Sequence, residues 1–465
     1  MTGKQAIIEF FVKNNIHDLF YLPGIHTLSL SQAFSGENIN VYITRHESNM
    51  VFMADGFSRV SGKIGVLIVT PGPGLANVVT GCMEAYGDDV PLLVIHIDTG
   101  REGIDKGILH GVAEPETMVR HVTKEVFYVQ STDDLIIKLD SARKVAMTDR
   151  KGPVLISIPY TLLEKEVETI RSSEENPVQM QHIDDFDGLE KVLAGKKKPV
   201  IIGGKALMFE KARPLLDNIC LHFSIPFLTT TSGKGILDEE NVWCFGNIMQ
   251  KGIAKKIVSS ADIIIAIGTR LRDVDAKRRG VKISDLIHVD VDRAWFDKNY
   301  SAAYRASGKI LPFLHALNEI FTSSSFNWRL KELKEAQHLE RLGLQNKFLG
   351  FQLINVIKNS IPDDTTTVWD LNLMAYWAEY YYPVRHQHTF IMPRGISSIF
   401  YALPAAIGAK TAKPEKPCLA ICGDGGVLPT ISELSTIRKY NIPVAILVFN
   451  NSGFGILEDL SLIHI

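Results

Sequence analysis

Short apolar runs alternate with amphipathic stretches of helical spacing along most of the chain. In the first segment the runs are rich in Val, Ile and Leu, and helix-like stretches lie between them. This alternation predicts an α/β fold with a doubly wound parallel sheet. We expect its strands at Leu19–Tyr21, Val41–Thr44, Ile64–Val69, Leu92–Ile95 and Val154–Ile158.

The same alternation continues in two further segments. A polar stretch, Ser172–Pro177, predicts a linker after the first segment, and a charged helical stretch, Arg329–Lys347, leads to the third. The second segment is expected to form strands at Val200–Ile202, Ala261–Gly268 and Leu286–Val291. Because 465 residues exceed one ordinary core, we expect three domains, over residues 1–170, 185–325 and 345–465.

The third segment contains a strand, a helix and a second strand in close succession. Apolar runs lie at Cys418–Cys422 and Val444–Phe449, and the stretch Thr430–Tyr440 between them has helical spacing. Its apolar stripe is formed by Ile431, Leu434 and Ile437. A connection of this length predicts parallel strands with a right-handed crossover.

Each of these two strands is followed by residues that can bind a metal ion or a phosphate. Gly423-Asp424-Gly425-Gly426 follows the first, and Asn450-Asn451 follows the second, so both groups are expected at the carboxyl edge where open α/β sheets bind ligands. A carboxylate and an amide oxygen suit a magnesium ion that also takes phosphate oxygens. The paired glycines expose backbone N–H groups to a phosphate. A dinucleotide fold would not need the asparagine pair.

A second candidate cluster begins at Arg45-His46-Glu47, where the strand Val41–Thr44 ends and a helix begins. Taken alone, Glu47 would be a solvated first-turn acid favoured by the helix dipole. The next strand ends in the glycine-proline turn Thr70–Gly74, which lets backbone approach a ligand closely. The two turns together favour a ligand site near Glu47.

Composition narrows the class of protein. The net charge of −2 gives no reason to expect a nucleic acid or an acidic membrane surface as partner, and the apolar runs are too short to span a bilayer. Five cysteines lack zinc-type spacing, and Cys418 and Cys422 are expected in the core. These features predict a reduced, soluble, cytoplasmic protein.

The motifs resemble those of acetolactate synthase-like enzymes, which depend on thiamine diphosphate. Arg45–Glu47, Ala54–Gly56, Thr70–Gly74 and Pro91–Ile95 are similar to their pyrimidine-binding domain. Gly395–Gly408 and Gly423–Asn451 are similar to their diphosphate-binding domain, and the middle segment has the layout of their central domain. The resemblance covers the chain to about Asp459.

The resemblance implies thiamine diphosphate- and Mg²⁺-dependent decarboxylation of a pyruvate-like 2-oxo acid, followed by carboligation. Glu47 would be catalytic, because it would hydrogen-bond a ring nitrogen of the cofactor's aminopyrimidine and stabilise the imino form. The metal would be held by Asp424, Asn451 and the backbone carbonyl of Gly453, and Ile399 would wedge the cofactor into a bent shape. The implied cofactor-binding residues are Gly24, Pro73, Gly74, Asn77, Gly395, Ile399, Gly423, Asp424, Gly425, Gly426 and Asn451.

The family also implies a homo-oligomer, a dimer or a tetramer, because its site forms between the first domain of one subunit and the third domain of another. A flavin (FAD) in the central domain is an open alternative, but the Gly203-Gly204 turn alone is weak support, and a purely structural domain is preferred.

Several positions depart from the pattern of acetohydroxyacid synthases and indicate an altered acceptor pocket. They are Arg101, Lys106–Ile108, Val274, Asp370–Met374 and Leu460. The expected substrate contacts are Ile25, His26 and Arg101; His26 titrates near neutrality and could relay protons. The alternatives are a decarboxylase or lyase that does not couple the product, and an inactive partner of a full-length relative.

The chain's last residues do not look like the family's continuation. After Asn451 the family has further strands and helices, whereas here only Ser452–Ile465 follow. We therefore expect the third domain to be incomplete, with Ser461–Ile465 foreign to it. A nicotinamide dehydrogenase is the most distant alternative, because no G-x-G-x-x-G follows a predicted strand.

Overall fold

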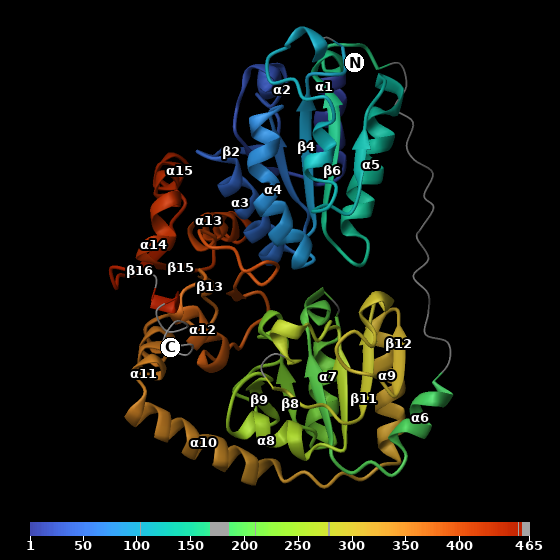
Figure 1. Cartoon of the computed structure of the whole chain (residues 1–465), viewed down its shortest axis with the longest axis vertical. Coiled ribbons are helices and arrows are strands. Elements are labelled where there is room, and N and C mark those ends of the chain that lie inside the picture. The colour runs from blue at the N-terminus through green and yellow to red at the C-terminus, as the bar shows by residue number, and fades with distance from the viewer. Residues whose placement is uncertain (103, 168–185, 210, 278–279, 454, 458–465) are drawn as a thin grey trace. The chain divides into compact units, whose positions relative to one another are not determined.

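Three β-sheets, whose assigned strand pairings are parallel, form the framework of the chain in the computed structural model (Figure 1). The structure describes residues 1–102, 104–167, 186–209, 211–277, 280–453 and 455–457. The predicted linker Ser172–Pro177, Leu460 and the stretch Ser461–Ile465 lie outside these ranges. The chain forms two compact units, one of residues 1–177, 366–372 and 391–465, the other of residues 178–365 and 373–390.

The first sheet has the strand order β2-β1-β3-β4-β6-β5, and its pairings are parallel. All five strands predicted for this segment are confirmed, and β5 was not predicted. The strands are β1 (Asp18–Tyr21), β2 (Asn40–Ile43), β3 (Gly65–Val69), β4 (Leu92–Asp98), β5 (Val126–Tyr128) and β6 (Pro153–Pro159). The helices are α1 (Gly3–Lys13), α2 (Leu28–Ala33), α3 (Glu47–Ser61), α4 (Pro73–Gly87) and α5 (Thr132–Met147).

Side chains alternate between the two faces of this sheet, as the period of a strand requires. On β3, Val66 and Ile68 belong to the core under α1 and α5, whereas Leu67 and Val69 belong to the core under α3 and α4. Both faces are therefore covered by helices, which confirms the predicted doubly wound arrangement.

The third sheet has the order β14-β13-β15-β16, with β15 parallel to both neighbours. Its strands are β13 (Thr366–Trp369), β14 (Phe390–Ile391), β15 (Cys418–Gly423) and β16 (Ala445–Phe449). Its helices are α13 (Ala402–Ala412), α14 (Asp424–Val427), a 3₁₀ helix (Leu428–Glu433) and α15 (Leu434–Tyr440). The predicted strand, helix and strand are confirmed. Cys418 and Cys422 are buried, as expected.

The predicted apolar stripe of this helical stretch is wrong in part. Ile431 and Leu434 are 50% and 42% exposed, and only Ile437 packs against the core. The inward face is instead polar, formed by Thr430, Glu433 and Thr436. The physical reason is hydrogen bonding: Glu433 accepts from the backbone N–H of Arg45 at 2.9 Å and from the hydroxyl of Thr436 at 2.7 Å, which holds the polar face inward.

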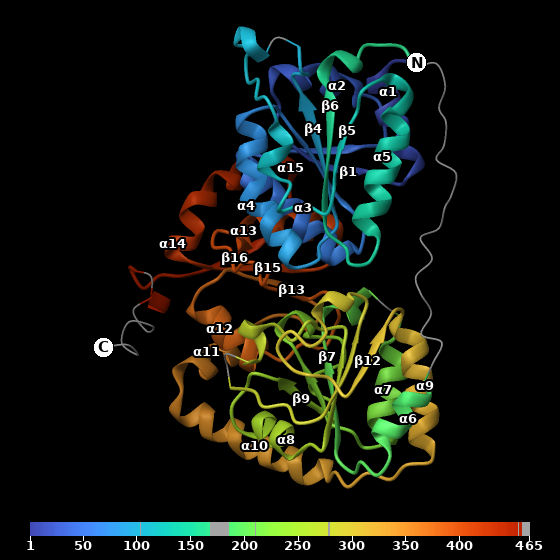
Figure 2. The ribbon, with the colours of Figure 1, turned by 45° about the vertical axis from the view of Figure 1, so that its right-hand side comes forward.

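The first and third sheets share one core. Helix α3 lies beside α13 in both views (Figures 1 and 2). The two backbones approach closely at glycines: a Cβ on Gly56 would lie 2.0 Å from the carbonyl oxygen of Ala405, and one on Gly408 would lie 1.8 Å from that of Met53. Larger residues there would push the helices apart.

The second unit contains the sheet β12-β11-β10-β7-β8-β9, again parallel. Its strands are β7 (Pro199–Gly203), β8 (Phe227–Thr229), β9 (Cys244–Asn247), β10 (Ile263–Ile267), β11 (Leu286–Asp290) and β12 (Tyr304–Ser307). Its helices are α6 (Asp187–Leu193), α7 (Arg213–His222), α8 (Ile253–Ser260), α9 (Ile310–Thr322), α10 (Leu330–Lys347), α11 (Leu349–Ser360) and α12 (Leu373–Tyr381). The three strands predicted here and the charged helix are confirmed. The exact domain boundaries stay predictions.

Candidate active site

Glu47 is the first residue of α3 and is fixed by a neighbouring helix. The side-chain amide of Asn77, on α4, donates to Oε2 of Glu47 at 2.9 Å. The hydroxyl of Ser48 donates to the backbone carbonyl of Asn77 at 2.6 Å, which ties the two helix starts together. Asn77 therefore orients Glu47 through Oε2.

Two glycine-containing turns bring backbone close to Glu47. A Cβ on Gly74 would lie 2.4 Å from Oγ1 of Thr70 and 3.7 Å from Oε1 of Glu47. A Cβ on Gly24 would lie 2.4 Å from Cγ2 of the same Thr70. Pro73 is the first residue of α4. The structure thus gathers Gly24, Pro73, Gly74, Asn77 and Glu47 at the carboxyl ends of β1, β2 and β3.

Three rings from different strand exits meet beside these turns. The ring centroid of His26 is 5.6 Å from that of His110 and 5.6 Å from that of Tyr160. Nδ1 of His26 is buried and has no hydrogen-bond partner among the described residues. Burial, and secondarily the charge of His110, lowers the pKa of His26. Both effects favour the neutral form of the His26 ring.

Sequence reasoning singled out His26 but missed His110 and Tyr160. Tyr160 directly follows β6, so a survey of every strand exit would have found it. His110 lies in the long loop after β4, where its Cα is 3.3 Å from the Cβ position of Gly72. No local sequence pattern indicates that His110 lies close to this turn.

The other two tentative substrate residues have different surroundings. Ile25 is 71% exposed. The guanidinium of Arg101 pairs with Glu116 at 2.5 Å, donates to the carbonyl of Ala113 at 2.6 Å and lies over the ring of Tyr128. Arg101 thus already has protein partners.

The second group of candidate residues lies at the edge of the third sheet. The register of the two strands pairs Gly423 with Phe449, so Asp424 and Asn450 leave neighbouring parallel strands at the same level. Asp424 opens α14. The side chain of Asn451 lies against Gly455, since a Cβ there would be 2.4 Å from its Nδ2. This arrangement agrees with the edge predicted from the sequence.

Asp370, at the end of β13, is a further acid at this edge. A Cβ on Gly426 would lie 2.1 Å from its Oδ2, so this glycine is required for the turn to pass the carboxylate. Burial raises the pKa of Asp370 to about 6, although backbone N–H groups, among them that of Tyr401, oppose the rise. Asp370 was noted in the sequence only as part of a departure from the family pattern.

Gly395 and Ile399 lie in the segment between β14 and α13. Ile399 is 42% exposed, so its side chain is available to a ligand. Among the described residues, no hydrogen bond joins Glu47 to Asp424 or Asn451. The predicted residues therefore form two groups within one chain, one around Glu47 and one around Asp424.

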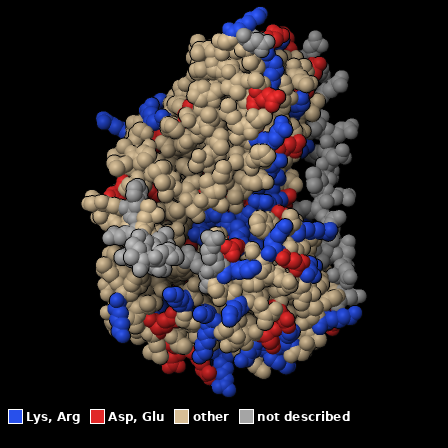
Figure 3. All heavy atoms as spheres, in the orientation of Figure 1, with Lys and Arg blue, Asp and Glu red and all other residues tan. Residues whose placement is uncertain are grey.

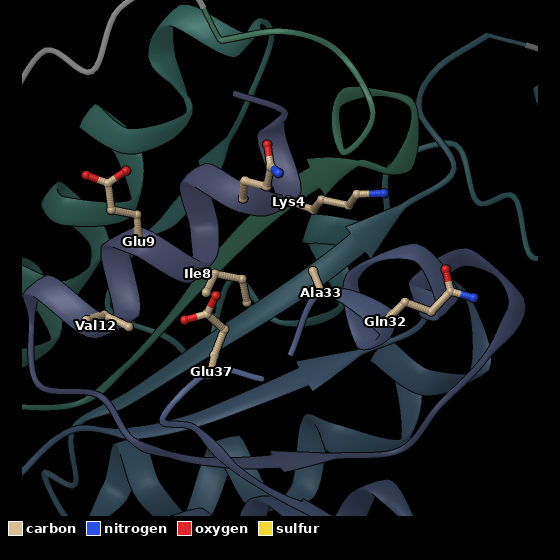
Figure 4. Close-up of a pocket in the computed structure, with 8 residues that line it drawn as sticks. Lys4, Ile8, Glu9, Val12, Gln32, Ala33 and Glu37 are labelled. Atoms are coloured by element: carbon tan, nitrogen blue, oxygen red, sulfur yellow. The ribbon is translucent and has the colours of Figure 1, made fainter. Parts of the chain in front are cut away.

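The described residues contain no cluster of metal-ligating side chains, and their surface cavity lies away from the candidate site. No group of three or more His, Cys, Asp and Glu is placed to hold a metal ion, and the predicted metal set contains a single residue of these types, Asp424. A surface cavity of about 480 Å³ lies between α1 and α2 (Figure 4) and contains none of the predicted site residues. No described helix is both long and apolar enough to cross a membrane.

Comparison with known families assigns all three segments. Residues 1–122 match the thiamine pyrophosphate enzyme N-terminal TPP binding domain, residues 187–317 the central domain, and residues 372–462 the C-terminal TPP binding domain. The chain belongs to the thiamine pyrophosphate enzymes, in the acetolactate synthase-like group.

Individual relatives of the chain include both decarboxylases and synthases. A probable 2-ketoarginine decarboxylase of Pseudomonas aeruginosa is 31% identical over 99% of this chain and 84% of its own length. A probable acetolactate synthase large subunit of Methanococcus aeolicus is 27% identical over 98% of this chain and 82% of its own length. The acetolactate synthase large subunit of Lactococcus lactis is 28% identical over the same shares.

Proposed function

We propose that the protein decarboxylates a pyruvate-like 2-oxo acid with thiamine diphosphate and Mg²⁺ and couples the product to an acceptor. The observation that carries this proposal is the register of β15 and β16, which brings Asp424 and the asparagine pair to one edge. A carboxylate, an amide oxygen and the carbonyl of Gly453 form the hard-oxygen set that Mg²⁺ takes together with phosphate oxygens.

The residues present suit this cofactor. A Cβ on Gly74 or Gly426 would collide with Thr70 or Asp370, so each turn needs glycine to pass these side chains beside the proposed site. The diphosphate would be bound by Gly423–Gly426 through the metal and backbone N–H groups, and the aminopyrimidine would meet Glu47. Thiamine diphosphate, when bound, supplies the electron sink for loss of CO₂ from a 2-oxo acid.

The protein's own contribution is positioning and proton transfer. Asn77 fixes Oε2 of Glu47, which leaves Oε1 to give or accept a proton. Ile399 would restrict the shape of the bound cofactor, and the glycine turns would let backbone approach it closely. The substrate would lie near His26 and His110 at the exits of β1 and β4.

A second candidate function is decarboxylation without coupling. The observation that favours it is the His26, His110 and Tyr160 cluster, whose rings can deliver a proton to the reacting carbon in place of an acceptor. The two functions differ in product: an aldehyde for simple decarboxylation, a hydroxyketone or acetohydroxy acid for coupling. Because the chain is similar to relatives of both kinds, both candidate functions are retained.

We also propose a homodimer or a higher homo-oligomer. The exposed residues of α4 include Pro73, Ala76, Thr80 and Met83, none of which is charged. Figure 3 shows that the face over α4 has few Lys, Arg, Asp or Glu side chains. An uncharged face beside Glu47 favours a second copy of the chain, which would bring its own Asp424 group to this Glu47.

The function is tested by incubating the protein with thiamine diphosphate, Mg²⁺ and a series of 2-oxo acids. We expect CO₂ release that depends on both cofactors, with pyruvate among the substrates, and products identified by nuclear magnetic resonance. A carbon–carbon-coupled product supports the first function, and an aldehyde supports the second. No CO₂ from any 2-oxo acid, with cofactor binding demonstrated, would reject both.

Replacing His26 with Ala is expected to lower turnover by about 10²-fold or more, because a positioned general acid or base typically contributes about 10²–10⁴-fold. His110→Ala should show a similar loss, and the double variant should lose little more, since both rings belong to one cluster. His121→Ala, an exposed histidine outside the cluster, is the control. Unchanged turnover and product ratio in His26→Ala would remove this residue from the site.

A further inference from the structure

The loop of residues 394–400, which precedes α13, has a constrained backbone. It contains no helix or strand, and it carries Gly395 and Ile399 of the proposed cofactor site. Ser397 and Phe400 have φ values of 61° and 68°, in the left-handed region that non-glycine residues avoid. Such conformations persist only where the surrounding structure fixes them. The loop therefore needs an external restraint.

The side chain of Glu84 provides that restraint. Glu84 lies on α4 of the first sheet and is completely buried. Its Oε1 accepts the backbone N–H of Gly395 at 2.6 Å, and its Oε2 accepts those of Ile396 and Ser398 at 3.2 Å and 2.9 Å. One carboxylate therefore satisfies three amide groups of the loop, which flank Ser397 on both sides.

Neighbouring acids hold the two ends of the loop. Asp88, the residue after the last residue of α4, accepts the backbone N–H of Arg394 at 3.2 Å and pairs with Arg59 at 2.8 Å. At the other end, the hydroxyl of Tyr401 bonds to the carboxylate of Asp55. Because both ends of the loop are anchored, the hydrogen bonds of Glu84 determine the conformation of the loop between them.

A matching arrangement holds the loop that carries Glu47. Glu433, a buried acid of the third segment, accepts the backbone N–H of Arg45 at 2.9 Å and the side-chain amide of Asn49 at 3.0 Å. Each half of the proposed site is thus supported by an acid from the other segment of the same chain. This symmetry favours a role in the site over a purely local packing role for these acids.

We propose that Glu84 is a positioning residue of the cofactor site, whose carboxylate fixes the loop 394–400 so that Ile399 is presented to the cofactor. The proposal rests on the proposed function only for the identity of the ligand. Its structural part, the restraint on the loop, can be measured without any cofactor.

Glu84→Gln is the informative variant, because it keeps the size of the side chain and removes one acceptor oxygen. Three amide groups then compete for a single oxygen, and the new NH₂ group faces at least one of them. In the cofactor-free protein, hydrogen exchange at Gly395, Ile396 and Ser398 is expected to become at least about tenfold faster. Exchange at Ala405 in α13 should stay as in the wild type.

Loss of the restraint on the loop should also weaken binding of the cofactor. In Glu84→Gln, calorimetric titration with thiamine diphosphate and Mg²⁺ is expected to give about tenfold weaker binding, while the KM for the 2-oxo acid stays unchanged. Adding Ser397→Gly should restore part of the affinity, because glycine adopts the left-handed conformation without a steric cost. Glu37→Gln, which makes the same chemical change at an exposed position of the first segment, is the matched control.

Two results would overturn the proposal. One is wild-type exchange rates at the three amides in Glu84→Gln, and the other is faster exchange with unaltered cofactor affinity. If the wild-type chain binds no thiamine diphosphate, the proposed function and the role of Glu84 in cofactor binding are both rejected. The exchange rates still decide whether Glu84 restrains the loop 394–400. Glu84→Asp, which keeps both oxygens on a shorter side chain, replaces Glu84→Gln if the latter does not fold.

Discussion

Glu47→Gln is expected to lower turnover of the 2-oxo acid by about 10²–10⁴-fold, the usual contribution of a positioned acid or base. Glutamine retains the size and the contact with Asn77, but it cannot hold or release a proton at Oε1. The loss should appear in kcat, because the group acts on the chemical step and not on binding of the substrate. Steady-state kinetics at saturating cofactor measure it.

The control for this variant separates chemistry from folding. Glu37→Gln makes the same chemical change at an exposed position of the first segment and should leave turnover unchanged. The melting temperature of Glu47→Gln without cofactor should remain close to that of the wild type. A Glu47→Gln protein with wild-type kcat would show that the catalytic acid is elsewhere.

Asp424→Ala is expected to abolish binding of thiamine diphosphate with Mg²⁺. The metal would lose its only carboxylate, and the remaining amide and carbonyl oxygens carry no charge to hold a divalent ion. In the wild type, ligand at 100 times its Kd adds about 2.7 kcal/mol to the free energy of unfolding. A thermal-shift titration should therefore show a rise in Tm that disappears in the variant.

A matched variant tests whether the loss of any acidic side chain would have the same effect on the rise in Tm. Glu415→Ala removes one exposed acid just before β15 and should keep the full rise in Tm. A cofactor-dependent shift that survives in Asp424→Ala would place the metal elsewhere. No shift in any of the proteins would mean that this chain does not form the diphosphate site.

Much of the framework could be predicted because parallel strands buried on both faces are continuous apolar runs. The strands β3, β4 and β6 are of this kind, and their Val, Ile and Leu residues made them recognisable. Strand β5 (Val126–Tyr128) was not predicted, because it consists of only three half-buried residues at the edge of the sheet. Short edge strands carry little periodic signal.

Glu47, Asp424 and Asn451 could be proposed as site residues from the sequence because each lies within four residues of the end of a strand. The supporting residues were not predictable, because their partners are distant in sequence. Glu84 contacts Gly395, 311 residues away, and Glu433 contacts Arg45, 388 residues away. From local pattern alone, Glu84 is an ordinary helix acid, and the inward-facing Glu433 interrupts an apolar stripe.

The shared core of the first and third sheets has a consequence for biosynthesis. Helix α3 ends at Ser61, whereas α13, which covers one of its faces, begins at Ala402. The ribosome must add about 340 residues in between, which takes roughly 20 to 70 seconds at about 5–20 residues per second. During that time the apolar surface of α3 around Met53 and Gly56 lacks its covering helix. The nascent chain is therefore expected to be a client of chaperones that bind exposed apolar segments before release.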